Sequence, residues 1–236
     1  MRSQLFDASH AEVATGERWS LQSSRMLRVA LGGDVLAAKG SMVAYQGQVR
    51  FDHESAGSLG RLLKKVVTNE DTPLMRVSGA GEVFFARAAE HVFLIQLEGD
   101  GLSVDGKNLL AFDADVSWDI RRVAGAGMAA GGLFNLELRG TGVVALTSDG
   151  PPVLLDCAAQ RTYVDVQAAV AWSSNLQPQV VNSTNMRSLL RGGTGEAFQY
   201  AFSGPGFVLV QPSEGRPVVP SSGGGGGMGG LGGLFT

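Results

Sequence analysis

The chain has 236 residues, of which 44% are hydrophobic and 17% charged, and its formal net charge is −3. This length suffices for one large all-β domain or for two smaller domains, each with a real core. The weak negative charge excludes a general electrostatic attraction to nucleic acid or anionic lipid, and leaves only a local basic patch open.

The N-terminal residues and the cysteine content bear on the cellular compartment. Residues 1–7 lack the basic start and apolar stretch of a secretion signal, and no run of about 18 apolar residues occurs in the sequence. We therefore expect a cytoplasmic protein without a transmembrane segment. Cys157 is the single cysteine, which excludes an internal disulfide and a cysteine-cluster metal site, and its apolar neighbours predict a buried thiol.

The first predicted strand carries an apolar residue, an alanine and an aromatic residue, Val43-Ala44-Tyr45, followed by Val49. The same Ala-aromatic pattern returns at Leu110-Ala111-Phe112 and at Val170-Ala171-Trp172. The three starts, at 43, 110 and 170, lie 67 and 60 residues apart. Recurrence at such a spacing indicates that one structural unit occurs three times.

A helical pattern follows at residues 58–68, where leucine and valine recur at i, i+3, i+4 and i+7. Arg61, Lys64 and Lys65 occupy its other face. We expect one short helix that packs on the sheets. Peripheral contact with a membrane surface remains an alternative for a basic amphipathic helix.

The next predicted strand alternates apolar residues with others and then enters a Gly-x-Gly pair. Alternation is typical of a half-buried strand, and paired glycines inside a strand indicate a sharp bend or a close backbone approach. This pattern also occurs three times and alternates with the Ala-aromatic pattern along the chain. The pairs are Gly79 and Gly81, Gly140 and Gly142, and Gly204 and Gly206.

Together these patterns predict an all-β fold of the β-sandwich or double-stranded β-helix type, with three pseudo-repeated units in one closed domain. We expect the strands at 198–210 to complete a ring begun by residues 26–49. Residues 213–236 are expected to form a flexible Gly-rich tail, because ordering them costs much backbone entropy. The approximate units are residues 1–70, 71–133 and 134–212.

Each unit has a variable connector between its Ala-aromatic strand and its glycine-pair strand. If an approximate three-fold axis relates the units, the connectors gather at one end, which is the candidate interaction face. The alternative is that these residues are ordinary solubilising charges. The face would comprise Arg61, Leu62, Lys64, Lys65, Arg121, Arg122, Arg187 and Arg191.

The residue types that carry catalysis are sparse. His10, His53 and His91 are isolated and show no metal-ligand spacing, and no Gly-x-Ser-x-Gly elbow occurs. The glycine pairs run into strand-like residues and not into a helix N-terminus, which disfavours phosphate binding. We therefore expect no enzyme activity, no cofactor and no metal.

Four segments carry a family resemblance: Gly-Ser-Met-Val-Ala-Tyr at 40–45, the Val-Asp and Ala-aromatic combinations within 104–113 and 163–173, and Gly-Pro-Gly with Gln211 within 195–211. With the Gly-rich tail, they resemble the altered inheritance of mitochondria protein 24 family, which has many bacterial members. The resemblance implies a fold similar to the trp RNA-binding attenuation protein. It implies no established enzymatic activity for bacterial members, and an association of mitochondrial relatives with inner-membrane organisation.

The leading functional hypothesis is a non-enzymatic scaffold or binding protein whose connector-bearing end contacts a protein partner or a membrane-associated complex. One alternative is nucleic-acid binding through the basic connector face, although no motif of the RNA-binding namesake is found. Another is a β-sandwich protein that binds a small ligand or a metal. The oligomeric state does not follow from the sequence, and fold likeness is a weak argument for function.

Overall fold

The computed structural model describes residues 1–54, 74–123, 134–182 and 198–214. The all-β prediction is confirmed, because the helices of these residues are two short 3-10 turns near the N-terminus. The helix expected at 58–68 lies outside the described residues. The elements are η1 (Gln4–Phe6), η2 (Ala8–His10), β1 (Trp19–Ser23), β2 (Met26–Leu31), β3 (Val35–Ala38), β4 (Met42–His53), β5 (Leu74–Phe85), β6 (His91–Asp105), β7 (Leu109–Asp113), β8 (Ser117–Arg122), β9 (Phe134–Ser148), β10 (Val153–Asp156), β11 (Thr162–Asp165), β12 (Ala169–Ser173), β13 (Gln179–Asn182), β14 (Phe198–Phe202) and β15 (Phe207–Val210).

One pattern of strand pairing occurs three times, around the strand that holds each glycine pair. By this pairing the first unit comprises β1–β5, the second β6–β9 and the third β10–β15, which differs from the approximate bounds 1–70, 71–133 and 134–212 expected from the sequence. In the second unit, the first half of β9 lies between the end of β6 and β8, and its second half lies between the start of β6 and β7. In the first unit, β5 lies in the same way between β3 and the end of β4, and then between β2 and the start of β4. In the third unit the central strand is divided into β14, between β11 and β13, and β15, between β10 and β12.

The Ala-aromatic pattern coincides with an irregularity in this pairing. Where β4, β7 and β12 pair with the central strand, the register shifts just before Ala44, Ala111 and Ala171. A one-residue bulge turns the following side chain toward the other face of the strand. The sequence pattern therefore marks the same structural position in all three units.

The glycine pairs lie where each central strand passes from one set of partners to the other. All six glycines have positive φ, between 111° at Gly79 and 154° at Gly142. A Cβ atom at Gly79 or Gly81 would overlap a carbonyl oxygen of β4, at Gln48 or Gln46. Only glycine tolerates this combination of backbone angle and close approach.

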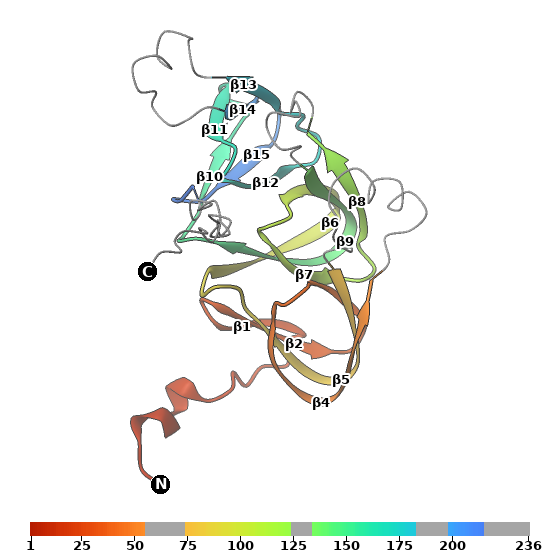
Figure 1. Ribbon diagram of the computed structural model, residues 1–236, viewed down its shortest axis with the longest axis vertical. Coiled ribbons are helices and arrows are strands. Elements are labelled where there is room, and N and C mark those ends of the chain that lie inside the picture. The colour runs from red at the N-terminus through yellow and green to blue at the C-terminus, as the bar shows by residue number, and fades with distance from the viewer. Residues whose placement is uncertain (55–73, 124–133, 183–197, 215–236) are drawn as a thin grey trace, which may run out of the picture.

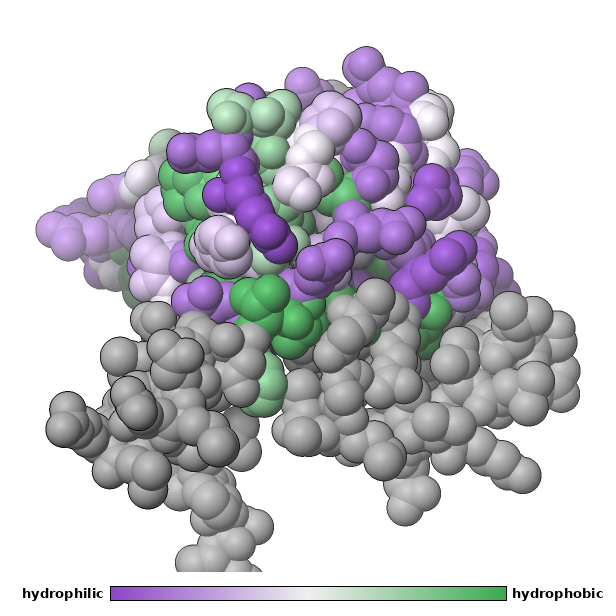
Figure 2. All heavy atoms as spheres, turned by 90° about the horizontal axis from the view of Figure 1, so that it is seen from above, coloured by the Kyte–Doolittle hydropathy of each residue, from purple (hydrophilic) through white to green (hydrophobic). Residues whose placement is uncertain are grey.

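The units follow one another along the longest axis of the molecule, with the first unit at one end and the third at the other (Figure 1). Figure 2, viewed from the end that carries the third unit, shows apolar side chains reaching the surface among hydrophilic ones. The sheet path runs β1-β2-β5-β3-β7-β9-β6-β12-β15-β10, and β11-β14-β13 form a second sheet.

The expected ring closure is not found among the described strands. β14 and β15 pair within the third unit, and neither pairs with a strand of residues 26–49. The physical reason is the spatial order of the units. Strands of neighbouring units pair in sequence order along the axis, which keeps the first and third units apart (Figure 1).

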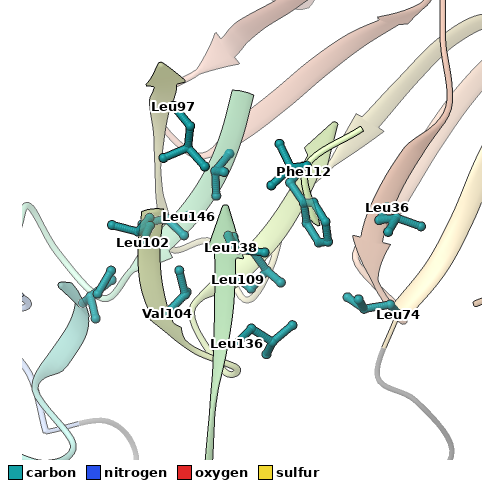
Figure 3. Packing of buried hydrophobic residues seen from close by; sticks show 14 residues of the cluster. Leu36, Leu74, Leu97, Leu102, Val104, Leu109, Phe112, Leu136, Leu138 and Leu146 are labelled. Carbon is teal, nitrogen blue, oxygen red and sulfur yellow. The ribbon is translucent and has the colours of Figure 1, made fainter. Parts of the chain in front are cut away.

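The core is shared between the units. Its central cluster includes Leu36 and Leu74 from the first unit, Leu138 and Leu146 from the second, and Val170 from the third. Figure 3 shows these leucines, among other members, converging from β3, β5 and β9. Because these side chains are 0–1% exposed, each unit depends on its neighbour to bury its apolar face.

Candidate interaction face and the cleft between the second and third units

Most of the predicted interaction face lies outside the described residues. This holds for Arg61, Leu62, Lys64, Lys65, Arg187 and Arg191. Arg122 is the last residue of β8, and Arg121, just before it, has a described side chain that is 63% exposed. The gathering of all eight side chains at one end therefore stays a prediction.

The starts of β5 and β9 bear on the prediction that the connectors gather at one end of the molecule. β5 begins at Leu74 and β9 begins two residues before Leu136, and each follows a connector. In Figure 3 Leu74 and Leu136 both lie in the lower part of the view, near the starts of β5 and β9. The described starts of these two strands therefore lie on the same side of the view.

Arg121 lines a cleft of about 250 Å³ between the second and third units. Strands β6, β8 and β9 form one side, and β12 with the residues after it forms the other. Val123, the last described residue before the second connector, is part of the wall. The lining residues are Ser103, Arg121, Val123, Asn135, Glu137, Arg139, Trp172, Ser174, Leu176, Gln177 and Pro178.

Two arginines of this cleft are exposed, and each lies near a carboxylate. Arg139 approaches Glu137 at 3.4 Å, and Arg121 approaches Asp119 at 3.4 Å. The side chains of Arg139 and Arg121 are 56% and 63% exposed. The Arg121–Asp119 pair is exposed on both sides and holds its partners weakly, whereas the Glu137 carboxylate is only 13% exposed. Both guanidinium groups are open to solvent and carry further donors for a bound carboxylate.

The inner part of the cleft is buried and combines polar with aromatic side chains. Asn135 and Ser103 are buried, and the Asn135 amide donates a hydrogen bond to the Ser103 hydroxyl at 3.3 Å. Trp172, also buried, packs against Tyr200 and Phe202 with ring centroids 5.4 Å and 5.3 Å away. Burial raises the pKa of the Tyr200 phenol, so this aromatic cluster stays neutral.

A second groove of about 500 Å³ adjoins the cleft and shares Arg139 and Ser174 with it. Its walls are the bend of β6 around Gly99 and Asp100, and Asn175 with Phe207 of the third unit. Together the two depressions form a continuous surface along the junction of the units. We call this surface, the lining of both, the junction cleft.

Three further observations concern the chemistry that the sequence disfavoured. No cluster of three or more His, Cys, Asp or Glu side chains suited to a metal occurs in the described parts of the chain. The prediction of a buried Cys157 is confirmed, since this residue is 1% exposed. No helix within the described ranges is long and apolar enough to span a membrane.

The junction cleft contains residues that sequence reasoning did not select. Asn135, Glu137 and Arg139 alternate with Leu136 and Leu138 along β9. This alternation places the three polar residues on one face of the strand, and it is the only signal for them in the sequence. The alternation does not reveal that the third unit packs beside this face of β9.

The comparisons with known proteins identify a family and a fold. A family model described as "Mitochondrial biogenesis AIM24" matches residues 19–213. The crystal structure of protein SPYM3_0169 from Streptococcus pyogenes is similar, with a TM-score of 0.64 and 21% identity, and the likeness covers 82% of this chain and 91% of that one. At this identity the likeness concerns the fold alone. No curated protein matches the sequence.

Proposed function

Because the chain belongs to the mitochondrial biogenesis AIM24 family, whose description names no reaction, we propose that it is a non-enzymatic scaffold that binds a protein partner at the junction cleft. The observation that carries the proposal is the cleft itself. It combines exposed guanidinium groups with buried hydrogen-bonding groups, on strands of two units that share a core. Sites on such a rigid scaffold hold a partner without reorganisation.

The chemistry of the cleft favours an extended acidic segment of a protein. Arg121 and Arg139 offer bidentate donors to carboxylates, and the exposed Gln177 offers an amide group to a backbone. The buried Trp172 and Leu176 form the apolar floor beneath these groups. This combination of a small apolar floor and a polar rim is typical of protein interfaces.

Nucleic acid is less favoured as the partner. A phosphate backbone requires a continuous basic groove. Here Asp119 and Glu137 lie 3.4 Å from the two arginines, so the described part of the cleft is electrostatically mixed. The similarity to the fold of the trp RNA-binding attenuation protein, the cytoplasmic location and a link to membrane-associated complexes remain parts of the proposal.

A photo-cross-linking experiment tests the site. A photoreactive residue at Gln177, which is exposed in the cleft, should capture a defined protein in cells that produce this chain. The same residue at Arg25, exposed in the turn between β1 and β2, is the matched control. Identical products from both positions would contradict a partner at the cleft.

Charge reversal provides the second half of this test. R121E combined with R139E should abolish the cross-link from Gln177 because both guanidinium groups are lost to the partner's carboxylates. R25E should leave the cross-link unchanged. Undiminished capture by the doubly reversed variant, with an unchanged melting temperature, would show that the partner does not use the junction cleft.

The larger groove gives one specific reason to consider a small ligand. Its volume of about 500 Å³ lies within the range of small-molecule sites. Native mass spectrometry of the purified chain should then reveal a bound compound that R139E releases. An unmodified mass would dispose of a retained ligand.

A further inference from the structure

Two internal junctions join the units, and both follow one rule of strand pairing. At the first, β3 pairs antiparallel with β7, so that Ala37 is opposite Ala111 and Leu36 is opposite Phe112. At the second, the end of β6 pairs antiparallel with β12, so that Val104 is opposite Ala171 and Ser103 is opposite Trp172. In each case the strand that precedes an Ala-aromatic strand in one unit pairs with the Ala-aromatic strand of the next unit.

The backbone hydrogen bonds at the two junctions are equivalent as well. The Ala114 amide donates to the Asp34 carbonyl oxygen at 3.2 Å, and the Ser174 amide donates to the Gly101 carbonyl oxygen at 3.1 Å. Each donor is the third residue after the alanine of the pattern. The junctions are therefore two instances of one interface.

This rule leaves one edge without a partner at each end of the molecule. The start of β4, residues 42–46, is the Ala-aromatic strand of the first unit, and within the described ranges β4 pairs with β5 alone. β11 is the corresponding preceding strand of the third unit, and within those ranges it pairs with β14 alone. The two edges lie at opposite ends of the longest axis, so one copy cannot join them (Figure 1).

The aromatic residue of each Ala-aromatic strand shows how much surface a partner strand buries. Phe112 and Trp172, at the internal junctions, are 0% and 2% exposed, whereas Tyr45 is 50% exposed. On the other edge Tyr163 is 54% exposed. Residues 42–46 and 162–164 include no charged side chain, although β11 ends at Asp165 and the Arg161 guanidinium lies 5.5 Å from the centroid of the Tyr163 ring. Unpaired edges of this kind are templates for pairing with another chain.

We infer that a second copy of this chain covers these edges, with β4 of one copy paired antiparallel to β11 of the next. The register of the internal junctions places Ala44 opposite Val164, Tyr45 opposite Tyr163 and Gln46 opposite Thr162. The interface is head-to-tail, so repeated addition produces a ring or an open filament. Such assembly is independent of partner binding at the junction cleft.

The N-terminal segment borders this interface. The Gln46 side-chain amide donates a hydrogen bond to the Glu12 carboxylate, at the end of the paired stretch. Residues 42–45 precede this contact along β4 and include two exposed large hydrophobic side chains, Val43 and Tyr45. The segment before β1 therefore touches the margin of the edge at Gln46.

Cysteine cross-linking tests the register. In a C157A background, Y45C and Y163C are prepared as separate full-length variants and then mixed under mild oxidation. Side chains directly opposite on antiparallel strands have Cβ atoms within disulfide reach. The mixture should give a disulfide-linked dimer of one Y45C and one Y163C chain, distinguished by an affinity tag on one of them.

The unmixed variants are the controls for a head-to-tail interface. Y45C alone and Y163C alone should remain unlinked, because neither residue meets its own counterpart. Efficient linkage of Y45C to itself would show a symmetric edge-to-edge dimer and would overturn the proposed pairing. Absence of any link in the mixture would do the same.

Sedimentation velocity tests assembly without cysteines. The wild-type chain should form species larger than its 24.6 kDa mass, and Y163K should return them to the monomer by placing an unpaired charge in the interface. V153K, which adds the same charge at a 53% exposed position on β10, is the matched control and should assemble normally. A wild-type chain that stays monomeric at all concentrations, or equal loss in both variants at unchanged melting temperatures, would refute the inference.

Discussion

Phe112 and Tyr45 occupy the same position in two units, yet one is fully buried and the other is half-exposed. Both follow the bulge of an Ala-aromatic strand, and both strands pair with the second half of their central strand. The difference is the neighbour on the other side. Phe112 lies opposite Leu36 of the preceding unit, whereas Tyr45 has no preceding unit. Burial of this residue is thus a property of the junction and not of the unit.

The largest expected effect breaks an internal junction. Phe112→Ala should lower the free energy of unfolding by about 3–5 kcal/mol, because it opens a cavity between two units. Tyr45→Ala should cost about 1 kcal/mol or less at low protein concentration, since Tyr45 is half-exposed, with its ring edge-on to that of Phe51. Urea denaturation measures both, and equal losses would contradict the assignment of burial to the junction.

A smaller effect concerns the residue that follows the aromatic side chain. Asp113 accepts hydrogen bonds from the Val143 amide at 2.8 Å and the Trp19 indole at 3.1 Å, and it pairs with Arg18. Ser173, its equivalent, accepts from the Phe207 amide at 3.0 Å. Asp113→Ala should therefore cost about 2–4 kcal/mol, and Ser173→Ala about 1–2 kcal/mol.

Thermal unfolding followed by circular dichroism ranks these two variants. Asp113→Asn is the control for charge, since its amide oxygen can still accept the Val143 amide hydrogen bond while the ion pair with Arg18 is lost. It should fall between the wild-type chain and Asp113→Ala. A cost for Ser173→Ala as large as that for Asp113→Ala would show that the two junctions are stabilised alike.

The smallest expected loss of stability concerns the glycine pair, which all three units share. Gly140 has a φ of 120°, and a Cβ atom there would meet nothing within 4 Å, so Gly140→Ala tests backbone strain without a clash. We expect a loss of about 1–3 kcal/mol in the free energy of unfolding. Gly16→Ala, at another glycine with open space and without a positive φ, should change the stability little. Equal behaviour of the two variants would remove the strain argument.

Much of the local structure could be predicted from the sequence. The alternation around Leu136 and Leu138 predicted a strand, and Gly140 with Gly142 predicted its bend, because both signals depend on residues close together in the chain. The junction cleft could not be predicted. Its walls include Arg139 from β9 and Gln177 from the third unit, and their proximity depends on how units pack and not on any local pattern.

The ring closure shows the same limit. The sequence repeat implied that the third unit would meet the first, since the chain begins with an Ala-aromatic half and ends with a glycine-pair half. The spatial order of the units instead leaves β4 and β11 at opposite ends (Figure 1). A sequence repeat specifies which strands pair at each interface between units. The rotation from one unit to the next decides whether the third unit can also pair with the first unit of the same chain.

By itself the sequence determined that three related β units exist, where their Ala-aromatic and glycine-pair strands lie and where their backbones bend, because side-chain alternation and glycine act over a few residues. The tertiary structure decided which of the equivalent side chains are buried and which polar groups meet in the junction cleft. The physical reason is that burial and convergence are set by strands from different units, whose pairing depends on the path of the whole chain.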